Sequence, residues 1–293
     1  MHQTADLDLS AAGTWPMGDR TVRRVGYGAM QLAGPGVFGP PRDHDQAVAV
    51  LRAAVAAGVD HIDTSDYYGP YVTNRIIREA LHPYPAGLTI VTKLGGRRGD
   101  QGEWLGAFSP DELRRGVESN LENLGLDALE VVNMRSMHGL HAPGEGPLEV
   151  QLETLADMQQ QGLIRHIGLS NVTRKQVEDG RKIVPIVCVQ NAYNLANRAD
   201  DALIDWLAGE GIAYVPFFPL GGFSPLQSAE LDAVAADLGT GPMQVALAWL
   251  LQRSPNLLLI PGTSSLAHLR ENLAAASLML PDAALVRLNA IGG

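Results

Sequence analysis

Cysteine is nearly absent from this chain of 293 residues. The single thiol, Cys188, lies inside the apolar run 186–190, so neither an internal disulfide nor a cysteine-based metal cluster can form. We expect Cys188 to be a buried, inert thiol. The eight histidines show no spacing that is typical of metal ligands, and the sequence therefore predicts no metal site.

Positive charge is also scarce. The chain carries 22 Lys and Arg residues against 32 Asp and Glu residues, which gives a formal net charge of -10, and its basic residues are scattered. A nucleic-acid groove or a surface that binds anionic lipids needs the opposite balance. We therefore expect no nucleic acid and no membrane among the partners, and an anionic ligand must be held by local hydrogen-bond donors.

Long hydrophobic runs are missing as well. No run approaches the roughly 20 apolar residues that a membrane span needs, and residues 1–8 lack the basic and apolar parts of a secretory leader. We expect a cytoplasmic protein. The chain also lacks internal repeats, low-complexity tracts and linkers, and its hydrophobic content of 46% can fill one large core. Residues 1–293 are therefore expected to form a single domain.

What the sequence does contain is a regular alternation. From Val25 onward a short apolar run, a turn rich in Gly, Pro, Ser, Asp or Asn, and a segment of helical periodicity follow one another repeatedly. Ser109 is typical of a helix cap, with Pro110 at the first helical position and Glu112 three residues after the cap. Further helices are expected at 47–57, 174–183, 229–238, 242–252 and 266–276. The predicted strands are 24–30, 61–64, 88–94, 129–134, 166–169, 186–190, 213–217 and 257–260.

Continuously apolar strands that alternate with helices predict a parallel sheet covered by helices. A count of eight favours a closed (β/α)8 TIM barrel, and residues 7–24 indicate an N-terminal β-hairpin that caps it. An open, doubly wound sheet is the alternative. The first strand does not supply that fold with its phosphate loop, because Gly26-Tyr-Gly28 is not followed by a third glycine at the required spacing.

The stretch His61-Ile-Asp-Thr-Ser-Asp-Tyr-Tyr-Gly69 and the later pair Thr92-Lys93 place ionisable side chains where strands end. In a (β/α)8 barrel the chemistry lies at these ends. A lysine cation lowers the pKa of a nearby tyrosine, and a carboxylate holds the lysine in place, so Asp63, Lys93 and a tyrosine can handle a proton together. From the residues alone Tyr67 and Tyr68 remain equal candidates, Lys93 can instead extend to solvent, and Asp63 can instead cap a helix.

This stretch resembles the signature of the aldo-keto reductases, in which Asp-Thr-Ala, two further residues and Tyr-Gly are followed by Thr-Lys at the next strand end. Other segments are similar to the cofactor-binding segments of that family and occur in the same order: Gly168-Leu-Ser-Asn171, Gln190-Asn191, Pro219-Leu220 after an aromatic pair, and Ile260-Pro-Gly-Thr-Ser264 running to Glu271-Asn272. The resemblance covers the chain from Val22 to its end. The loops 31–41, 132–135 and 217–223 resemble most the branch of the family that reduces pyridoxal.

The resemblance implies an NADP-dependent oxidoreductase acting on CH-OH groups, with pyridoxal reduced to pyridoxine, a form of vitamin B6, as the expected reaction. It implies that Tyr68, which Gly69 selects over its neighbour, donates the proton. Lys93 is then expected to lower the pKa of Tyr68, and Asp63 to hold the lysine.

The fourth catalytic position departs from the family, which usually has histidine at the end of its fourth strand. Alignment from Gly125-Leu-Asp127 places Arg135 there. A guanidinium orients and polarises a carbonyl or binds an anionic group, such as the phenolate of pyridoxal, but does not titrate near neutrality. His138 and His141 are the alternatives for the histidine's role.

The resemblance also implies a nucleotide site. Ser170, Asn171 and Gln190 are expected to hold the nicotinamide carboxamide, Phe217 to stack on its ring, and Gly262-Thr263-Ser264 to bind the 2′-phosphate. NADPH is preferred over NADH on this basis, although His268 stands where many relatives carry a strongly basic residue. The expected cofactor-binding residues are Gly28, Ala29, Met30, Ser170, Asn171, Gln190, Phe217, Phe218, Pro219, Leu220, Gly221, Gly262, Thr263, Ser264, His268, Glu271 and Asn272.

Three other functions stay open at this point. The protein can be a general aldehyde or ketone reductase, an NADPH-binding regulatory subunit with slow turnover, or a barrel isomerase or aldolase that uses Lys93 as a Schiff-base nucleophile. The expected partner is a small-molecule aldehyde, and a monomer is favoured. The loops that decide substrate specificity are expected to carry Phe38, Arg135, Met137, Phe218 and Phe223.

Overall fold

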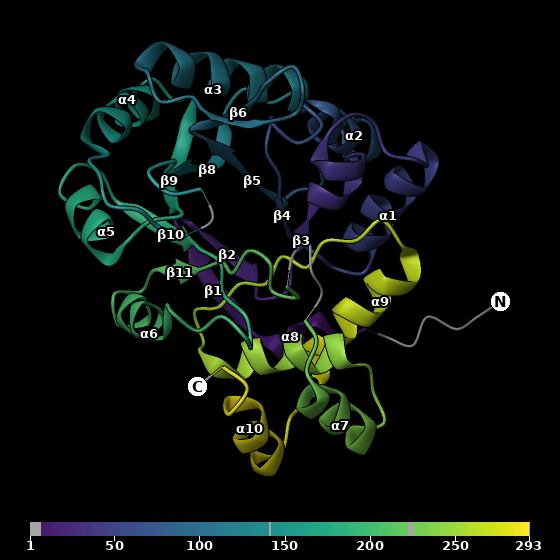
Figure 1. Ribbon diagram of the computed structural model, residues 1–293. Coiled ribbons are helices and arrows are strands. Elements are labelled where there is room, and N and C mark those ends of the chain that lie inside the picture. Colours follow the sequence, from purple (N-terminus) through teal and green to yellow (C-terminus); the bar gives the residue numbers. More distant parts are fainter. Residues whose placement is uncertain (1–6, 141, 222–225, 293) are drawn as a thin grey trace.

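The computed structural model describes residues 7–140, 142–221 and 226–292 (Figure 1). Seven strands form one parallel sheet, in the order β11-β10-β9-β8-β5-β4-β3. Their bounds are β3 Tyr27–Gly28, β4 His61–Asp63, β5 Thr89–Leu94, β8 Leu129–Arg135, β9 Ile164–Ser170, β10 Ile186–Gln190 and β11 Ala213–Tyr214. These strands lie within or close to the apolar runs that the sequence singled out.

Residues 257–262 close the sheet into a barrel. They form parallel bridges with Tyr214 at one edge and with Val25 and Gly28 at the other. The N–H of Leu258 donates to the carbonyl of Tyr214 at 2.9 Å, and the N–H of Leu259 donates to the carbonyl of Arg24 at 2.8 Å. The predicted (β/α)8 barrel is therefore confirmed, with its eighth strand present as single bridges rather than as a regular ladder.

The first and seventh strands are shorter than predicted. After Gly28 the chain turns into the 3-10 helix η2 (Ala29–Leu32), so the expected strand 24–30 was too long. Beyond β11 the N–H groups of Val215 and Phe217 still donate to the carbonyls of Val189 and Asn191, at 2.8 and 2.9 Å. This segment stays extended, but it leaves the regular ladder because its strand turns toward the end of the barrel where a cavity opens.

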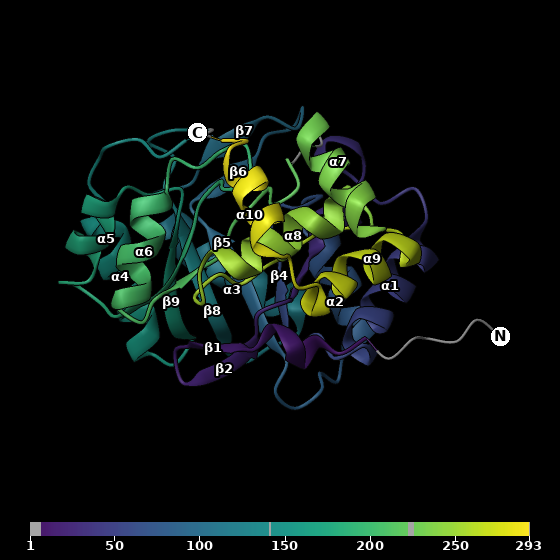
Figure 2. The ribbon, with the colours of Figure 1, turned by 90° about the horizontal axis from the view of Figure 1, so that it is seen from below.

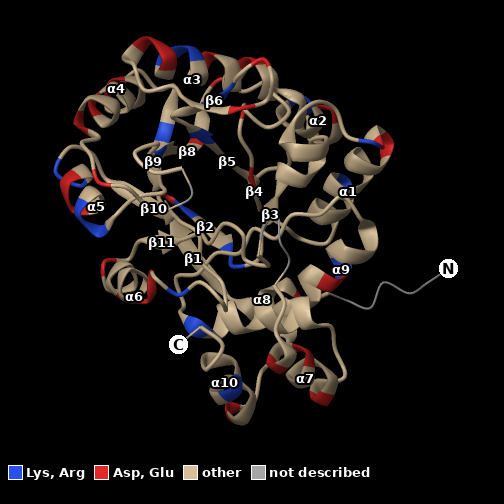
Figure 3. Cartoon of the chain, in the orientation of Figure 1, with Lys and Arg blue, Asp and Glu red and all other residues tan. Residues whose placement is uncertain are grey.

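Helices surround the barrel in chain order (Figure 1), and most of the charged residues belong to them (Figure 3). The predicted capping box is present: the Ser109 hydroxyl accepts from the N–H of Glu112, whose carboxylate accepts from the N–H of Ser109. Thr173 caps its helix with the same capping box, and the side chain of Ser265 caps its helix by accepting from the N–H of His268. The helices are α1 His44–Ala56, α2 Val72–Leu81, α3 Pro110–Leu124, α4 Glu149–Gln160, α5 Arg174–Gly180, α6 Asp201–Gly209, α7 Ala229–Leu238, α8 Pro242–Arg253, α9 Leu266–Ala274 and α10 Asp282–Asn289.

The expected N-terminal hairpin is confirmed as β1 (Thr14–Met17) and β2 (Arg20–Arg23), and it lies across one end of the barrel (Figure 2). Met17 and Val22 pack against the apolar barrel interior, which includes Val91, Val131 and Cys188. Burial raises the pKa of the Cys188 thiol to about 12, which agrees with an inert buried thiol. The hairpin therefore covers this end of the barrel (Figure 2).

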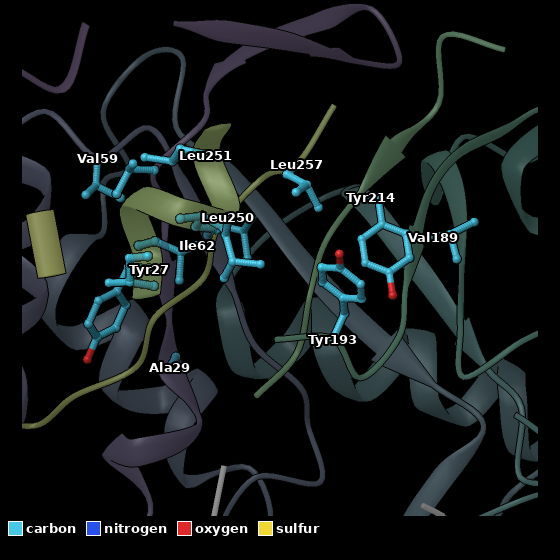
Figure 4. Packing of buried hydrophobic residues seen from close by; sticks show 14 of the residues in the cluster. Tyr27, Ala29, Val59, Ile62, Val189, Tyr193, Tyr214, Leu250, Leu251 and Leu257 are labelled. Carbon is cyan, nitrogen blue, oxygen red and sulfur yellow. The ribbon is translucent and has the colours of Figure 1, made fainter. Parts of the chain in front are cut away.

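A larger apolar core lies between the sheet and the helices. Figure 4 shows part of it, with Leu250 of α8 near Ile62 of β4, and Tyr193 beside Tyr214, whose ring centroids are 5.9 Å apart. In the described part of the chain no single helix is long and apolar enough to cross a membrane. Only the pair α7 and α8, bent by 93°, meets that test by length and composition, and most of α8 is buried in this core.

Candidate active site

A cavity of about 480 Å³ lies at the carboxyl ends of the barrel strands. Such ends converge in a (β/α)8 barrel, so side chains far apart in the sequence meet there. Thirteen of the predicted catalytic and cofactor-binding residues line the cavity: Gly28, Met30, Asp63, Tyr68, Lys93, Arg135, Gln190, Phe217, Phe218, Pro219, Leu220, Gly221 and Gly262. Tyr67 and Met137 line it as well.

Asp63 and Lys93 form a buried ion pair at the bottom of the cavity. Both side chains are buried, and the Lys93 ammonium contacts Oδ1 of Asp63. The ammonium also donates to the carbonyl of Thr64 at 3.0 Å, and Nε2 of Gln190 donates to the second carboxylate oxygen of Asp63 at 2.8 Å. A buried charge is tolerated when it is paired and hydrogen-bonded in this way. Lys93 therefore does not extend to solvent.

Two tyrosines lie directly beside this pair. The Lys93 nitrogen is 5.1 Å from the centroid of the Tyr68 ring, and the rings of Tyr67 and Tyr68 meet edge to face at 5.4 Å. Burial raises the pKa of both phenols well above its ordinary value. For Tyr68 the carboxylate of Asp63 raises the pKa further, while Arg135 lowers it. Lys93 and Arg135 both lower the pKa of Tyr67.

Arg135 ends strand β8, and its guanidinium lines the cavity. In the sheet register Arg135 lies opposite Ser170, whose hydroxyl accepts from Nη1 at 3.5 Å. Nη2 donates to the carbonyl of Leu140 at 3.1 Å, and Cζ lies 5.4 Å from the centroid of the Phe217 ring. A fixed positive charge thus stands at the position where the sequence analysis expected a departure from histidine.

His138 does not reach the cavity. Its Nε2 lies 3.0 Å from the carbonyl oxygen of Pro147, and its ring packs against Phe108 at 5.7 Å. His141, the other candidate for the histidine's role, and Phe223, expected among the specificity residues, lie outside the described residues.

Two buried carboxamide oxygens near the strand ends have no hydrogen-bond partner among the described residues: Oδ1 of Asn171 and Oε1 of Gln190. Both side chains are held in place by hydrogen bonds that their amide nitrogens donate. Asn171 donates to the carbonyls of Ser136 and Gly139, and Gln190 donates to Asp63. Unpaired buried acceptors are costly, on the order of 1–3 kcal/mol each, unless a ligand satisfies them. A ligand carboxamide, which carries two N–H donors, has the chemistry that they require.

The segment 217–221 forms one wall of the cavity. Phe217 pairs with Ala192 through a parallel bridge, and the turn that follows is closed by a hydrogen bond of 3.0 Å from the N–H of Gly221 to the carbonyl of Phe218. Across the cavity Gly28 and Gly262 approach closely: a Cβ on Gly28 would lie 2.4 Å from the carbonyl oxygen of Ile260. Glycine is thus required where the first strand meets the closing segment. An aromatic face and close-lying backbone suit a planar ring with a polyanionic tail.

Eight of the predicted cofactor residues do not line the cavity. Ala29, Ser170, Asn171, Thr263 and Asn272 are buried, whereas Ser264, His268 and Glu271 are exposed. Helix α9 begins at Leu266, and the side chain of Ser265 caps it by accepting from the N–H of His268. The residues of 263–272 therefore sit around the start of one helix just beyond Gly262, outside the cavity itself.

Gln31, Ile260 and Pro261 line the cavity within segments that the sequence analysis named, but it missed five lining residues: Trp104, Leu140, Ala192, Asn194 and Asn197. Trp104 lies on a hairpin formed by β6 (Gly96–Arg98) and β7 (Trp104–Gly106), which was not predicted. The glycines at 95, 96, 99 and 102 around a tryptophan were the available signal for a turn. In the described ranges no group of three or more His, Cys, Asp or Glu is placed to hold a metal ion.

Comparisons with known proteins agree with this geometry. Residues 24–292 match the model of the aldo/keto reductase family. The chain is 66% identical over 282 residues to pyridoxine 4-dehydrogenase of Escherichia coli (strain K12), covering 96% of this chain and 99% of that protein.

Solved structures show the same fold. A thermostable aldo-keto reductase in complex with the inhibitor epalrestat has a TM-score of 0.80 at 28% identity, over 95% of this chain and 99% of that one. An aldo-keto reductase from Klebsiella pneumoniae in complex with NADPH has a TM-score of 0.75 at 23% identity, over 94% of each chain. The chain belongs to the aldo/keto reductase family.

Proposed function

We propose that this protein reduces pyridoxal to pyridoxine with NADPH as the hydride source. Its 66% identity to the pyridoxine 4-dehydrogenase of Escherichia coli over nearly the full length of both chains supports this substrate. The observation that carries the proposal is the buried set of Asp63, Lys93 and Tyr68 at one end of a barrel cavity.

In this proposal Tyr68 donates the proton. Reduction of an aldehyde needs a hydride, which NADPH supplies when bound, and a proton for the developing alkoxide. Burial keeps the Tyr68 phenol protonated. The ion pair of Lys93 and Asp63 fixes the ammonium beside the phenol, where it stabilises the tyrosinate that remains after proton transfer.

Arg135 takes the place of the family's histidine. A guanidinium is a planar cation that carries only hydrogen-bond donors, so Arg135 orients the substrate and does not shuttle protons. In pyridoxal the aldehyde neighbours a phenolic oxygen. We assign Arg135 to this oxygen, because a planar cation binds an anionic oxygen with charge-assisted hydrogen bonds.

The nucleotide is assigned to the other residues around the cavity. Ser170, Asn171 and Gln190 hold the carboxamide, and the two unpaired oxygens described above accept its N–H groups. The ring of Phe217 would stack on the nicotinamide, and Leu220 and Gly221 would hold the pyrophosphate, with residues 28–30 also assigned to the cofactor. Residues 262–264, with His268, Glu271 and Asn272, bind the adenosine end and its 2′-phosphate.

The buried ion pair also bears on the aldolase alternative. A Schiff-base lysine needs a free nitrogen to attack a carbonyl, whereas the Lys93 nitrogen is held by the carboxylate of Asp63 and the carbonyl of Thr64. The proposal retains three sequence-based expectations, namely a single domain, action in the cytoplasm and a monomer. Size-exclusion chromatography with light scattering tests the last of these.

The test of the substrate is a comparison of rates. Oxidation of NADPH, followed by its absorbance, is measured with pyridoxal and with a panel of simple aromatic and aliphatic aldehydes. A clearly higher kcat/KM for pyridoxal supports the proposal. Equal values across the panel would make the protein a general aldehyde reductase, and a repeat with NADH tests the cofactor.

A further inference from the structure

The β6–β7 hairpin places an aromatic side chain beside the reacting end of the cavity. This hairpin follows directly after strand β5, which carries Lys93, and precedes helix α3. It lies at the end of the barrel opposite the N-terminal hairpin (Figure 2). Its residue Trp104 lines the cavity together with Tyr67 and Tyr68.

Trp104 is packed against Tyr67. Its ring meets the Tyr67 ring edge to face, with centroids 5.5 Å apart, and Tyr67 in turn meets Tyr68. These residues form a small apolar cluster of Val37, Tyr67 and Tyr68, with Met30, Ala33 and Trp104 packed against it. The cluster is separate from the main cores, so its packing serves the wall of the cavity.

Arg98 also contacts Trp104. Its guanidinium carbon lies 4.0 Å from the centroid of the Trp104 ring and 5.4 Å from that of Phe38. The guanidinium also donates to carbonyls of two loops: to Val37 at 2.9 Å and Gly36 at 3.1 Å, and to Gly102 at 2.9 Å. The guanidinium stacks on the indole and donates hydrogen bonds to both loops. Arg98 therefore fixes the hairpin to the loop after β3.

We propose that Trp104 is the surface on which the ring of an aromatic aldehyde packs, and that Arg98 is a positioning residue that holds Trp104 in place. This inference rests on the reductase function proposed above and names the substrate class of the same site as flat aromatic or heteroaromatic aldehydes. The proton donor Tyr68 and Trp104 flank Tyr67, so a ring that packs on the indole brings its carbonyl toward the phenol of Tyr68.

The discriminating experiment compares two substrates in four proteins. The proteins are the wild type, Trp104→Leu, Arg98→Met and the control Arg97→Met, whose side chain is about half exposed on the same strand, 3.9 Å from Glu112. The substrates are pyridine-4-carboxaldehyde and a small aliphatic aldehyde. Trp104→Leu should raise the KM ratio of aromatic to aliphatic aldehyde on the order of tenfold, because a lost aromatic contact has that effect.

Arg98→Met should change the ratio in the same direction by a smaller factor, and Arg97→Met should leave it as in the wild type. The change should appear in KM more than in kcat, since the ring contact is made in the ground state as well as in the transition state. Trp104→Phe, which preserves an aromatic ring, should have a KM ratio close to that of the wild type. This rescue separates a packing surface from a merely structural tryptophan.

A second readout tests the role of Arg98. The fluorescence of Trp104 in each protein is obtained by subtracting the spectrum of the same protein with Trp104→Phe added. Quenching of this fluorescence by acrylamide should increase in Arg98→Met but not in Arg97→Met. An unchanged KM ratio in Trp104→Leu, or an Arg98→Met protein that behaves as Arg97→Met does, would overturn the inference. Failure of the proposed function is a different result, in which the wild type shows no preference for pyridoxal while these ratios still respond to Trp104.

Discussion

Gln190 donates a hydrogen bond across the barrel to the carboxylate of Asp63, with 2.8 Å between Nε2 and Oδ2. Asp63 is therefore held from two strands, by Lys93 of β5 and by Gln190 of β10. The same bond leaves Oε1 of Gln190 without a partner among the described residues. One side chain thus links the ion pair to the place where the nicotinamide carboxamide is expected.

Replacement of Gln190 by Leu should impair both roles at once. The buried carboxylate of Asp63 loses a donor, which costs about 1–3 kcal/mol, and we expect kcat to fall roughly tenfold to a hundredfold. NADPH binding should weaken as well, because an acceptor for the carboxamide is removed. Steady-state kinetics and titration with NADPH measure the two effects. The control is Gln252→Leu, on α8 away from the cavity, which should change neither quantity.

Replacement of Arg135 by Met should change the pH dependence of the reaction. Burial and Asp63 raise the pKa of Tyr68 and Arg135 lowers it, so the variant should have a still higher pKa at Tyr68. Reduction needs the protonated phenol and should show no loss from Tyr68 below about pH 10 in either protein. Oxidation of pyridoxine needs the tyrosinate, so its rate should rise with pH, and in Arg135→Met this rise should begin at a higher pH.

The same variant tests substrate recognition. If Arg135 binds the phenolic oxygen, Arg135→Met should lose on the order of tenfold or more in kcat/KM for pyridoxal, and much less for pyridine-4-carboxaldehyde, which lacks that oxygen. Arg135→Lys keeps the charge without the planar fork and should fall between. Equal losses for both aldehydes would contradict the assignment.

Asp66, in the loop after β4, should make stability depend on pH. Burial raises the pKa of this carboxyl to about 7, against partial opposition from hydrogen bonds that include Asn120. Its folded pKa lies above the unfolded value, so the native state binds more protons between about pH 4 and pH 7, and Asp66 destabilises the fold as pH rises through that window.

Asp66→Asn should therefore raise the free energy of unfolding by about 1–3 kcal/mol at about pH 8 and by much less at about pH 5. Urea denaturation at the two pH values measures the difference. Asp179→Asn is the opposite case: its exposed carboxyl has a lowered pKa from hydrogen bonds with Lys175 and Lys182, and its replacement should bring no gain at high pH. An equal gain for Asp66→Asn at both pH values would contradict the titration.

Much of the fold followed from local signals. Apolar runs mark the strands because parallel strands are buried on both faces, and Ser109, Thr173 and Ser265 mark helix starts because their side chains satisfy free N–H groups. The closing segment was predicted as the apolar run 257–260, but its single bridges were not predicted. Those depend on how far the barrel edges diverge, which no short stretch of sequence encodes.

The candidate site was predictable only where a motif carried it. Asp63, Tyr68, Lys93 and Arg135 all line the cavity, as strand ends in a barrel should. The β6–β7 hairpin, which carries Trp104, could not be predicted. Its strands have three residues each and contain glycine, so they are too short to show an alternating pattern. The hydrogen bond between Gln190 and Asp63 could not be predicted either, since it joins residues 127 positions apart.

The role of Tyr68 is the centre of this account, and Tyr68→Phe tests it most directly, with Tyr67→Phe as the matched control. Both proteins are titrated with NADPH and then assayed for NADPH oxidation with pyridoxal. We predict that Tyr68→Phe binds NADPH as the wild type does and loses at least about a hundredfold in kcat, the scale of a missing proton donor, whereas Tyr67→Phe retains most of its activity. A Tyr68→Phe protein that turns over pyridoxal at the wild-type rate would contradict the account.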